Sequence, residues 1–291
     1  MYTSIIFLFK IIFIYAFIAL NINFLSVSGN SRGLRIFQGR DAKRGEFPYV
    51  VALSLKSSYP ENPIYESFCT GSIVTPIWVL TAAHCIPTIE PLINPPHNTS
   101  ENITILTPVI QYVSPADDYN WIASNIIRTI LHPNFKLSLT IDVNDIALVK
   151  VQNTKIKALG KISAIPVGTM YGHKVFSLGL GWMQSESGHI DNVLALNKPL
   201  QVYDAIVVNC ARRPPMSSVS PSLCLAWNCN KPTLSCPGDS GGPVVHPTGI
   251  VGIASASQIR HCNTTDNLVT PLVATPVSPY VDWIAMSVRG I

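Results

Sequence analysis

The chain has 291 residues, of which 47% are hydrophobic and only 12% are charged, so it is long enough to bury a substantial core. Its formal net charge of +4 falls to +1 without the first 35 residues, because these contain three cations and no acid. A nearly neutral remainder gives no reason to expect nucleic acid or an anionic membrane as a partner.

The first 28 residues have the pattern of a secretory signal peptide. Residues 5–20 are almost continuously apolar, Lys10 is the one charge among them, and small residues at 26–28 precede the expected cut after Ser28. An uncleaved signal anchor over residues 5–25 is the alternative, because that stretch is long enough to span a bilayer. Seven cysteines fit an oxidising secretory route, so we expect a secreted, extracellular protein. Three sequons predict N-glycosylation at Asn98, Asn102 and Asn263.

The body of the chain predicts β-structure. Short apolar runs rich in Val, Ile and Phe are separated by Gly, Pro and Asn, which favours an all-β barrel or sandwich. The 23 prolines argue against long helices. One helix is expected over residues 279–289, where Val281, Ile284 and Val288 recur at helical spacing. The expected strand runs are 49–55, 68–74, 146–151, 174–178, 193–200 and 250–254.

One long segment, residues 87–121, is rich in proline and contains two of the sequons. Such a segment is more often a solvated loop than a domain, so we expect a loop here. Because it follows His84 closely, it is also a candidate rim for a substrate cleft.

Three short motifs indicate chemistry: residues 81–85 (TAAHC), 144–148 (NDIAL) and 238–243 (GDSGGP). The glycines around Ser240 let the backbone come close to whatever the serine attacks, and the N–H groups of Gly238 and Ser240 can point at one oxygen. The chain order His, Asp, Ser, together with all three motifs, resembles the chymotrypsin/trypsin-like serine protease family. The likeness runs from about residue 35 to the C-terminus.

The resemblance implies two six-stranded antiparallel β-barrels, about 47–151 and 161–275, within a peptidase domain of residues 36–291. The active site then lies between the barrels. Ser240 is implied as the nucleophile, His84 as its general base and Asp145 as the group that orients the imidazole. Gly238 and Ser240 form the implied oxyanion hole.

The resemblance also implies activation by proteolysis, with residues 29–35 as a short propeptide. A cut after Arg35 frees the amino group of Ile36, which is expected to pair with the carboxylate of Asp239 and to order the oxyanion loop. Phe37 and Gln38 stand where the family has Val and Gly, so this match is partial.

The implied specificity pocket departs from that of trypsin. Leu234 takes the place of the aspartate at the pocket base, and leucine cannot compensate a buried lysine or arginine. Ser255 matches a residue whose backbone pairs with extended substrate, while Ser257 and Leu272 stand where open pockets have glycine. We therefore expect a preference for small or medium apolar residues before the scissile bond.

The family likeness implies three disulfides, and one cysteine, Cys229, is left over as a free thiol or an intermolecular link. Zinc ligation by Cys224, Cys229 and Cys236 is the metal alternative, which the absence of a C-x-x-C pattern disfavours. The implied pairs are Cys69 with Cys85, Cys210 with Cys224, and Cys236 with Cys262.

The sequence therefore predicts a secreted serine endopeptidase made as a zymogen, monomeric and without a cofactor. Expected partners are a protein or peptide substrate, an activating protease and a protein inhibitor, with no nucleic acid and no membrane. The alternatives are a non-catalytic homologue that binds a partner and a membrane-anchored protease.

Overall fold

The computed structural model describes residues 39–57, 63–93, 106–113, 121–138, 142–181, 183–184, 190–191, 199–210, 221–227, 236–256 and 272–290. All of them fall in one compact unit, Gly33–Ile291. The predicted signal peptide and propeptide lie outside the described residues, as do Arg35 and Ile36.

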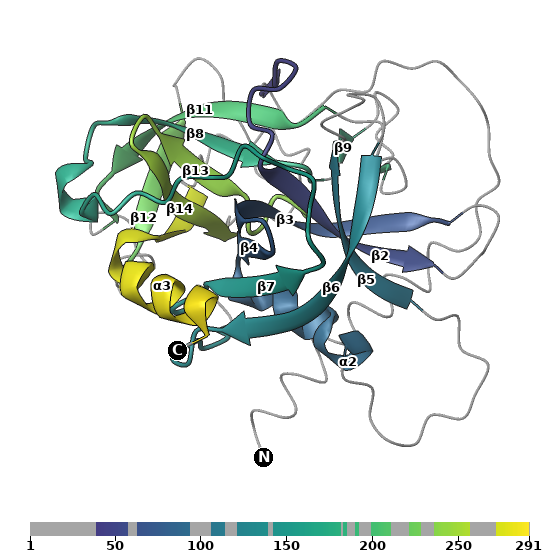
Figure 1. The fold of residues 1–291 in the computed structure, drawn as a ribbon. Helices are drawn as coiled ribbons and strands as arrows, with labels where there is room; N and C mark the ends of the chain where they lie inside the picture. The colour runs from purple at the N-terminus through teal and green to yellow at the C-terminus, as the bar shows by residue number, and fades with distance from the viewer. Residues whose placement is uncertain are drawn as a thin grey trace. The chain divides into compact units, whose positions relative to one another are not determined.

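Six strands of the first half close into an antiparallel barrel in the order β2-β3-β4-β7-β6-β5 (Figure 1). β2 closes the ring by pairing with β5, from Ala52 opposite Gln111 to Ser57 opposite Leu106. The bounds are Val50–Ser57 for β2, Tyr65–Thr75 for β3, Trp78–Thr81 for β4, Leu106–Val113 for β5, Trp121–Leu131 for β6 and Ala147–Val151 for β7.

The expectation of a loop over residues 87–121 is therefore wrong in part. β5 lies inside it, and Val109 and Ile110 are both 0% exposed in the barrel core. The same segment contains the end of the 3-10 helix η1, Ala83–Thr88, and the short helix α2, Glu90–Ile93.

The second half forms another ring of six antiparallel strands, in the order β8-β11-β12-β15-β14-β13 with β13 returning to β8. The two rings confirm the predicted fold class. β1, Arg40–Asp41, adds to β11, and β9, Met183–Gln184, pairs with β10, Ile190–Asp191. The ring strands are β8 Lys174–Gly179, β11 Gln201–Val208, β12 Leu223–Trp227, β13 Pro243–His246, β14 Gly249–Ala256 and β15 Leu272–Pro276.

Most of the expected strand runs coincide with observed strands. The run at 193–200 lies mostly outside the described residues, and its last two residues precede β11. Side chains alternate along β11, where Asp204 and Ile206 are exposed between buried neighbours, as a strand with one buried face requires.

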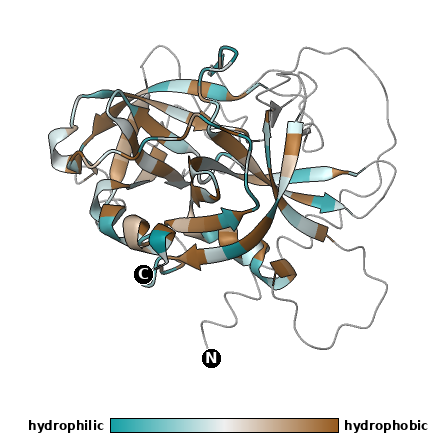
Figure 2. Ribbon diagram, viewed as in Figure 1, coloured by the Kyte–Doolittle hydropathy of each residue, from teal (hydrophilic) through white to brown (hydrophobic). Residues whose placement is uncertain are grey.

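The terminal helix α3, Val281–Arg289, follows the 3-10 turn η6, Ser278–Tyr280, and agrees with the predicted helix. It ends at Gly290, whose φ of 76° is the left-handed conformation that closes helices. Hydrophobic and hydrophilic residues alternate along it (Figure 2), and Ile284 is buried in the same core cluster as Val149 of the first barrel. Among the described residues, no helix is long and apolar enough to cross a bilayer.

Candidate active site

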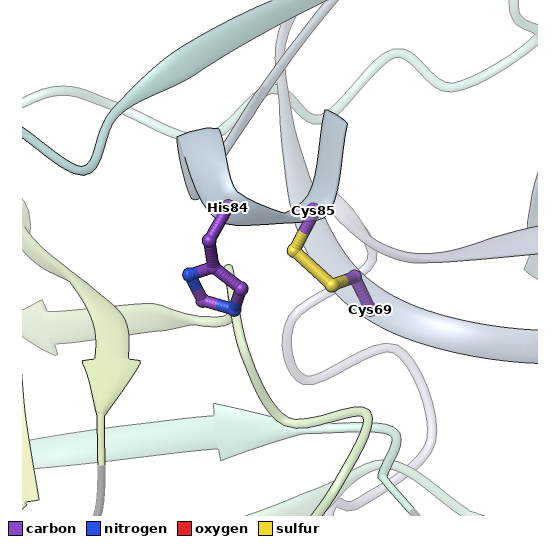
Figure 3. A group of neighbouring side chains, drawn as sticks. All are labelled: Cys69, His84 and Cys85. Atoms are coloured by element: carbon purple, nitrogen blue, oxygen red, sulfur yellow. A yellow bond between two sulfur atoms is a disulfide. The ribbon is translucent and has the colours of Figure 1, made fainter. Parts of the chain in front are cut away.

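The segment that carries His84 is held in place by the buried residues before and after His84. It follows β4 directly and forms η1, in which Ala83, Cys85 and Ile86 are buried. A disulfide joins Cys85 to Cys69 of β3, with 6.3 Å between the Cα atoms (Figure 3). The side chain of His84 is partly exposed, whereas the residues before and after it are buried. A ligand can therefore reach the imidazole while the backbone stays fixed.

Asp145 holds His84 through two hydrogen bonds. Its Oδ1 accepts the backbone N–H of His84 at 2.8 Å, and its Oδ2 lies 2.7 Å from Nδ1 of the ring. The hydroxyl of Ser255 donates to the same Oδ2 at 2.5 Å. With Nδ1–H directed at the carboxylate, Nε2 is the basic nitrogen of the neutral ring.

The charge of Asp145 is maintained despite its complete burial. Burial acts to raise its pKa, but the positive charge of His84 and the hydrogen bonds from His84 and Ser255 outweigh it, so the pKa lies below its usual range. A buried carboxylate that stays ionised stabilises a protonated imidazole beside it.

Asp145 is in turn positioned by the residue before it. Asn144 has φ of 52°, a left-handed conformation that asparagine tolerates better than most residues. Its Oδ1 accepts a 2.8 Å hydrogen bond from the hydroxyl of Tyr280, and its Nδ2 donates to the carbonyl of Asn134 at 2.8 Å. The turn before β7 is thus held from the C-terminal end of the chain.

The loop that carries Ser240 has a backbone that only glycine permits at two points. Gly238 and Gly241 have φ of 94° and 83°. A Cβ on Gly241 would lie 2.1 Å from Oγ1 of Thr81 and 2.2 Å from the carbonyl oxygen of Thr70. This close approach explains the glycine after the serine.

The backbone of Ser240 is fixed against the first barrel, near His84. Its carbonyl accepts the N–H of Thr70 on β3 at 2.8 Å, and Sγ of Cys85, the neighbour of His84, lies 3.9 Å from the same oxygen. Gly241 donates to the carbonyl of Ala254 at 2.7 Å, which ties the loop to β14. The structure therefore brings His84, Asp145 and the Ser240 loop into one site, with Ser255 of the second barrel bonded to Asp145. The oxyanion role of the Gly238 and Ser240 amides stays a prediction.

Asp239 is 1% exposed, and both of its carboxylate oxygens accept backbone N–H groups. Oδ1 accepts from Gly181 and Oδ2 from Cys236, each at 2.8 Å. A Cβ on Gly179 or Gly181 would lie 2.0 Å or 2.5 Å from Oδ1, so the carboxylate occupies a recess lined by glycine. Its expected pairing with Ile36 stays a prediction, because Ile36 lies outside the described residues.

Thr70 is a site residue that the sequence motifs do not reveal. Its hydroxyl, 0% exposed, donates to the carbonyl of Gly238 at 2.7 Å and accepts the N–H of Leu180 at 3.1 Å. One side chain of β3 therefore joins the oxyanion loop to the end of β8. No local pattern distinguishes Thr70, because β3 also contains Ser67, Ser72 and Thr75.

The structure describes two of the four predicted pocket residues, Ser255 and Leu272. Leu234 and Ser257 lie outside the described residues. Ser255 is partly exposed on β14 and has a side-chain contact with Asp145 that the sequence did not predict. Leu272 is 1% exposed in the core of the second barrel, so its role in narrowing the pocket stays a prediction.

Two of the predicted disulfides are present, Cys69–Cys85 and Cys210–Cys224. The second removes the thiolate of Cys224 from the zinc alternative. Cys236 is buried, but its expected partner Cys262 lies outside the described residues, and so does Cys229. The sequons at Asn98, Asn102 and Asn263 also lie outside them.

Among the described residues, two clusters at the site contain residue types that can bind a metal ion. In both clusters, other bonds already occupy atoms that would have to bind the ion. In the first, Cys69 and Cys85 flank His84, but their sulfurs form the disulfide. In the second, His84, Asp142 and Asp145 place ligand atoms within 4.8 Å of one another. Both oxygens of Asp145 already accept hydrogen bonds, and Asp142 accepts one from the N–H of Ser138.

The chain is similar in sequence to a protein-family model and to several known proteins. A family model described as Trypsin matches residues 36–284. Human granzyme M is 31% identical over 263 residues, which cover 88% of this chain and 90% of the relative. A collagenase of Hypoderma lineatum is 27% identical over 258 residues, 86% of each chain. Serine protease SP24D of Anopheles gambiae is 27% identical over 270 residues, 89% of this chain and 83% of the relative.

Among solved structures, a similar fold is found in neuropsin, a serine protease expressed in the limbic system of mouse brain. The TM-score is 0.59 at 21% sequence identity, and the match covers 86% of this chain and 99% of neuropsin. At this identity the likeness concerns the fold alone.

Proposed function

Because this chain belongs to the trypsin family of serine endopeptidases, we propose that it hydrolyses peptide bonds with His84, Asp145 and Ser240. The observation that supports this most is the paired imidazole and carboxylate. His84 makes two hydrogen bonds to an ionised, fully buried Asp145, and the carbonyl of Ser240 is fixed beside the same helix.

Each residue has one task in the proposed reaction. The hydroxyl oxygen of Ser240 attacks the carbonyl carbon of the peptide while Nε2 of His84 takes its proton. The negative oxygen that forms is stabilised by the N–H groups of Gly238 and Ser240. His84 then gives its proton to the amine, the C–N bond breaks, and an acyl-enzyme remains on Ser240. Water, deprotonated by His84, releases the acid and restores the serine.

Asp145 contributes by holding one tautomer. Its carboxylate fixes the proton on Nδ1 of His84, which directs Nε2 toward the reaction, and it stabilises the imidazolium between the two proton transfers. The hydrogen bond from Ser255 keeps this carboxylate ionised and oriented.

Activation by a cut after Arg35 is part of the proposal. The amino group of Ile36 is expected to pair with the buried carboxylate of Asp239, which also accepts the N–H groups of Gly181 and Cys236. Removing one member of a buried ion pair costs about 3–5 kcal/mol. That pair would order the loop from Gly238 to Ser240, so the uncleaved chain is expected to be poorly active. The proposal also includes secretion of the zymogen and removal of its signal peptide.

The proposed specificity is not tryptic. The family resemblance assigns Leu234 to the pocket base and Ser257 and Leu272 to its walls, and this set of residues favours small or medium apolar side chains before the scissile bond. An arginine or lysine there would be buried without a counter-charge.

Covalent labelling by a fluorophosphonate probe tests the proposal, because the probe phosphonylates only an activated serine. We expect labelling of Ser240 in protein cleaved after Arg35, and none in Ser240→Ala. An Arg35→Gln variant treated with the same activating protease is expected to stay unlabelled. Cleaved, folded wild-type protein without labelling would instead indicate the non-catalytic, partner-binding alternative. Labelling of the uncleaved variant would refute the zymogen mechanism alone.

A further inference from the structure

Two histidines outside the active site lie close together on the second barrel. His173 directly precedes β8, and His246 is the last residue of β13. Nδ1 of His173 is 3.3 Å from Nε2 of His246, and the ring centroids are 5.3 Å apart. His173 is exposed and His246 partly exposed, so solvent reaches the pair.

The backbone fixes both positions. His173 donates its N–H to the carbonyl of Met170 at 2.9 Å and accepts the N–H of Val207 at 3.0 Å. His246 stands opposite Gly249 at the turn between β13 and β14. Because β13 and β8 pair directly beside these residues, the short distance between the rings follows from the barrel.

The distance suits a metal ion. Zinc binds imidazole nitrogens at about 2.0–2.1 Å, which in tetrahedral geometry places two ligand nitrogens about 3.3–3.4 Å apart. We propose that His173 and His246 form a two-histidine site for a divalent transition-metal ion of the zinc class, with water completing its coordination. Imidazole ligands favour zinc, copper or nickel over magnesium and calcium.

A second layer of hydrogen bonds supports His246. Its Nδ1 lies 2.9 Å from Oγ1 of Thr248, which lies 2.7 Å from Oγ of the buried Ser163, and Nδ1 also accepts the backbone N–H of Thr248 at 3.3 Å. When Nε2 binds a metal, the ring proton must reside on Nδ1, so the contact with this backbone N–H is given up and the hydroxyl oxygen of Thr248 becomes the acceptor. Such outer partners orient metal-binding histidines and strengthen them as ligands.

An ion at this site would join two strands that lead to the active-site loops. β8 continues through Leu180 to Gly181, which bonds Asp239, and β13 follows the Ser240 loop. The expected effect is on the stability of the folded chain, because an ion that binds only the folded state shifts the unfolding equilibrium. At a zinc concentration 100-fold above Kd, the expected rise in Tm is about 5–10 °C.

Zinc titration of the full chain, prepared without a polyhistidine tag and as Ser240→Ala to prevent self-digestion, tests the site. Calorimetry and thermal unfolding are expected to show zinc binding with a matching rise in Tm. His173→Asn and His246→Asn should each weaken binding at least about tenfold and abolish the rise, and Thr248→Val should weaken it by about tenfold. His84→Asn is the matched control: loss of the imidazole beside Asp145 should lower the Tm measured without zinc, but the zinc affinity and the zinc-dependent rise in Tm should stay unchanged.

The proposal is overturned if wild-type and both histidine variants bind zinc equally, if no zinc-dependent rise in Tm occurs, or if His84→Asn removes the binding. A second measurement does not depend on the variants. Copper(II) bound to the same protein should give an electron paramagnetic resonance spectrum coupled to two imidazole nitrogens. Coupling to one imidazole, or to none, would show that the two rings share only a hydrogen bond.

Discussion

The hydroxyl of Tyr280 donates a 2.8 Å hydrogen bond to Oδ1 of Asn144, 136 residues earlier in the chain. The contact links the start of the terminal helix to the residue that precedes Asp145. A residue near the C-terminal helix therefore helps to set the position of Asp145, the proposed orienting carboxylate.

Replacement Tyr280→Phe tests this link. It removes the hydrogen bond and leaves the carboxamide oxygen of Asn144 without that donor, which should lower the free energy of unfolding by about 1–3 kcal/mol. Because the turn before Asp145 loosens, kcat should fall several-fold in steady-state peptide hydrolysis. Tyr171→Phe, at an exposed tyrosine, is the control and should change neither quantity. A full kcat in Tyr280→Phe would show that Asp145 is positioned without this contact.

The same tyrosine predicts an effect of alkaline pH. Burial and the negative charge of Asp145 raise the pKa of Tyr280 to about 12, whereas tyrosine in an unfolded chain ionises near about 10. The folded chain holds this proton more tightly, so its contribution to stability is complete below about pH 10 and is lost as the pH rises to about 12.

Phenolate absorbance during titration checks this effect. Tyr280→Phe should remove one tyrosine that titrates near 12 and flatten the loss of stability above about pH 10. The titration of Tyr49, whose pKa burial raises to about 12, should remain. An unchanged high-pH titration in the variant would contradict the assignment.

We predict that the hydroxyl of Thr70 positions the loop from Gly238 to Ser240. Thr70→Val keeps the shape but leaves the Gly238 carbonyl and the Leu180 N–H without this partner. We expect kcat to fall at least about tenfold with little change in KM, although less than the ~10²–10³-fold loss on removing an oxyanion-hole donor itself.

Two further measurements separate positioning by Thr70 from a general loss of stability. Thr70→Ser keeps the hydroxyl and should recover most of kcat. A peptide aldehyde, which resembles the transition state, should bind Thr70→Val more weakly in proportion to the loss of kcat. Equal loss in the Val and Ser variants would refute the role of the hydroxyl.

Two glycines with positive φ allow close packing to be compared with backbone strain. Gly45→Ala adds a methyl group in open space, at φ of 69°, and should cost about 1–2 kcal/mol of stability while hydrolysis persists. Gly241→Ala should cost more and abolish hydrolysis, because its Cβ would lie 2.1 Å from Oγ1 of Thr81. Chemical denaturation and peptide hydrolysis measure the two effects. Similar behaviour of the two variants would mean that the loop can shift to admit a side chain.

The alternation of apolar runs and turn residues predicted an all-β fold and five of the twelve ring strands, β2, β3, β7, β8 and β14. The arrangement in two barrels was predicted from the family resemblance. The strand at Leu106–Val113 was missed because Pro108 lies within it, opposite Leu55 of β2, and proline normally argues against a strand. The closure of the barrel required that segment, but closure depends on pairing between strands that no local pattern encodes.

The candidate site also contains some residues that local motifs predict and others that they do not. His84, Asp145 and Ser240 stand in motifs of five or six residues and could be predicted from them. Thr70 acts on Gly238 from 168 residues away, and Tyr280 acts on Asn144 from 136 residues away. Such partners become visible only when folding brings distant segments into contact.

Peptide-library hydrolysis by the chain after cleavage at Arg35, measured beside an identically cleaved Ser240→Ala variant, tests directly whether Ser240 is the nucleophile. We expect turnover by the wild-type protein, with cuts after small or medium apolar residues, and loss of nearly all turnover in the variant. Hydrolysis that continues undiminished without the serine hydroxyl would contradict this role of Ser240.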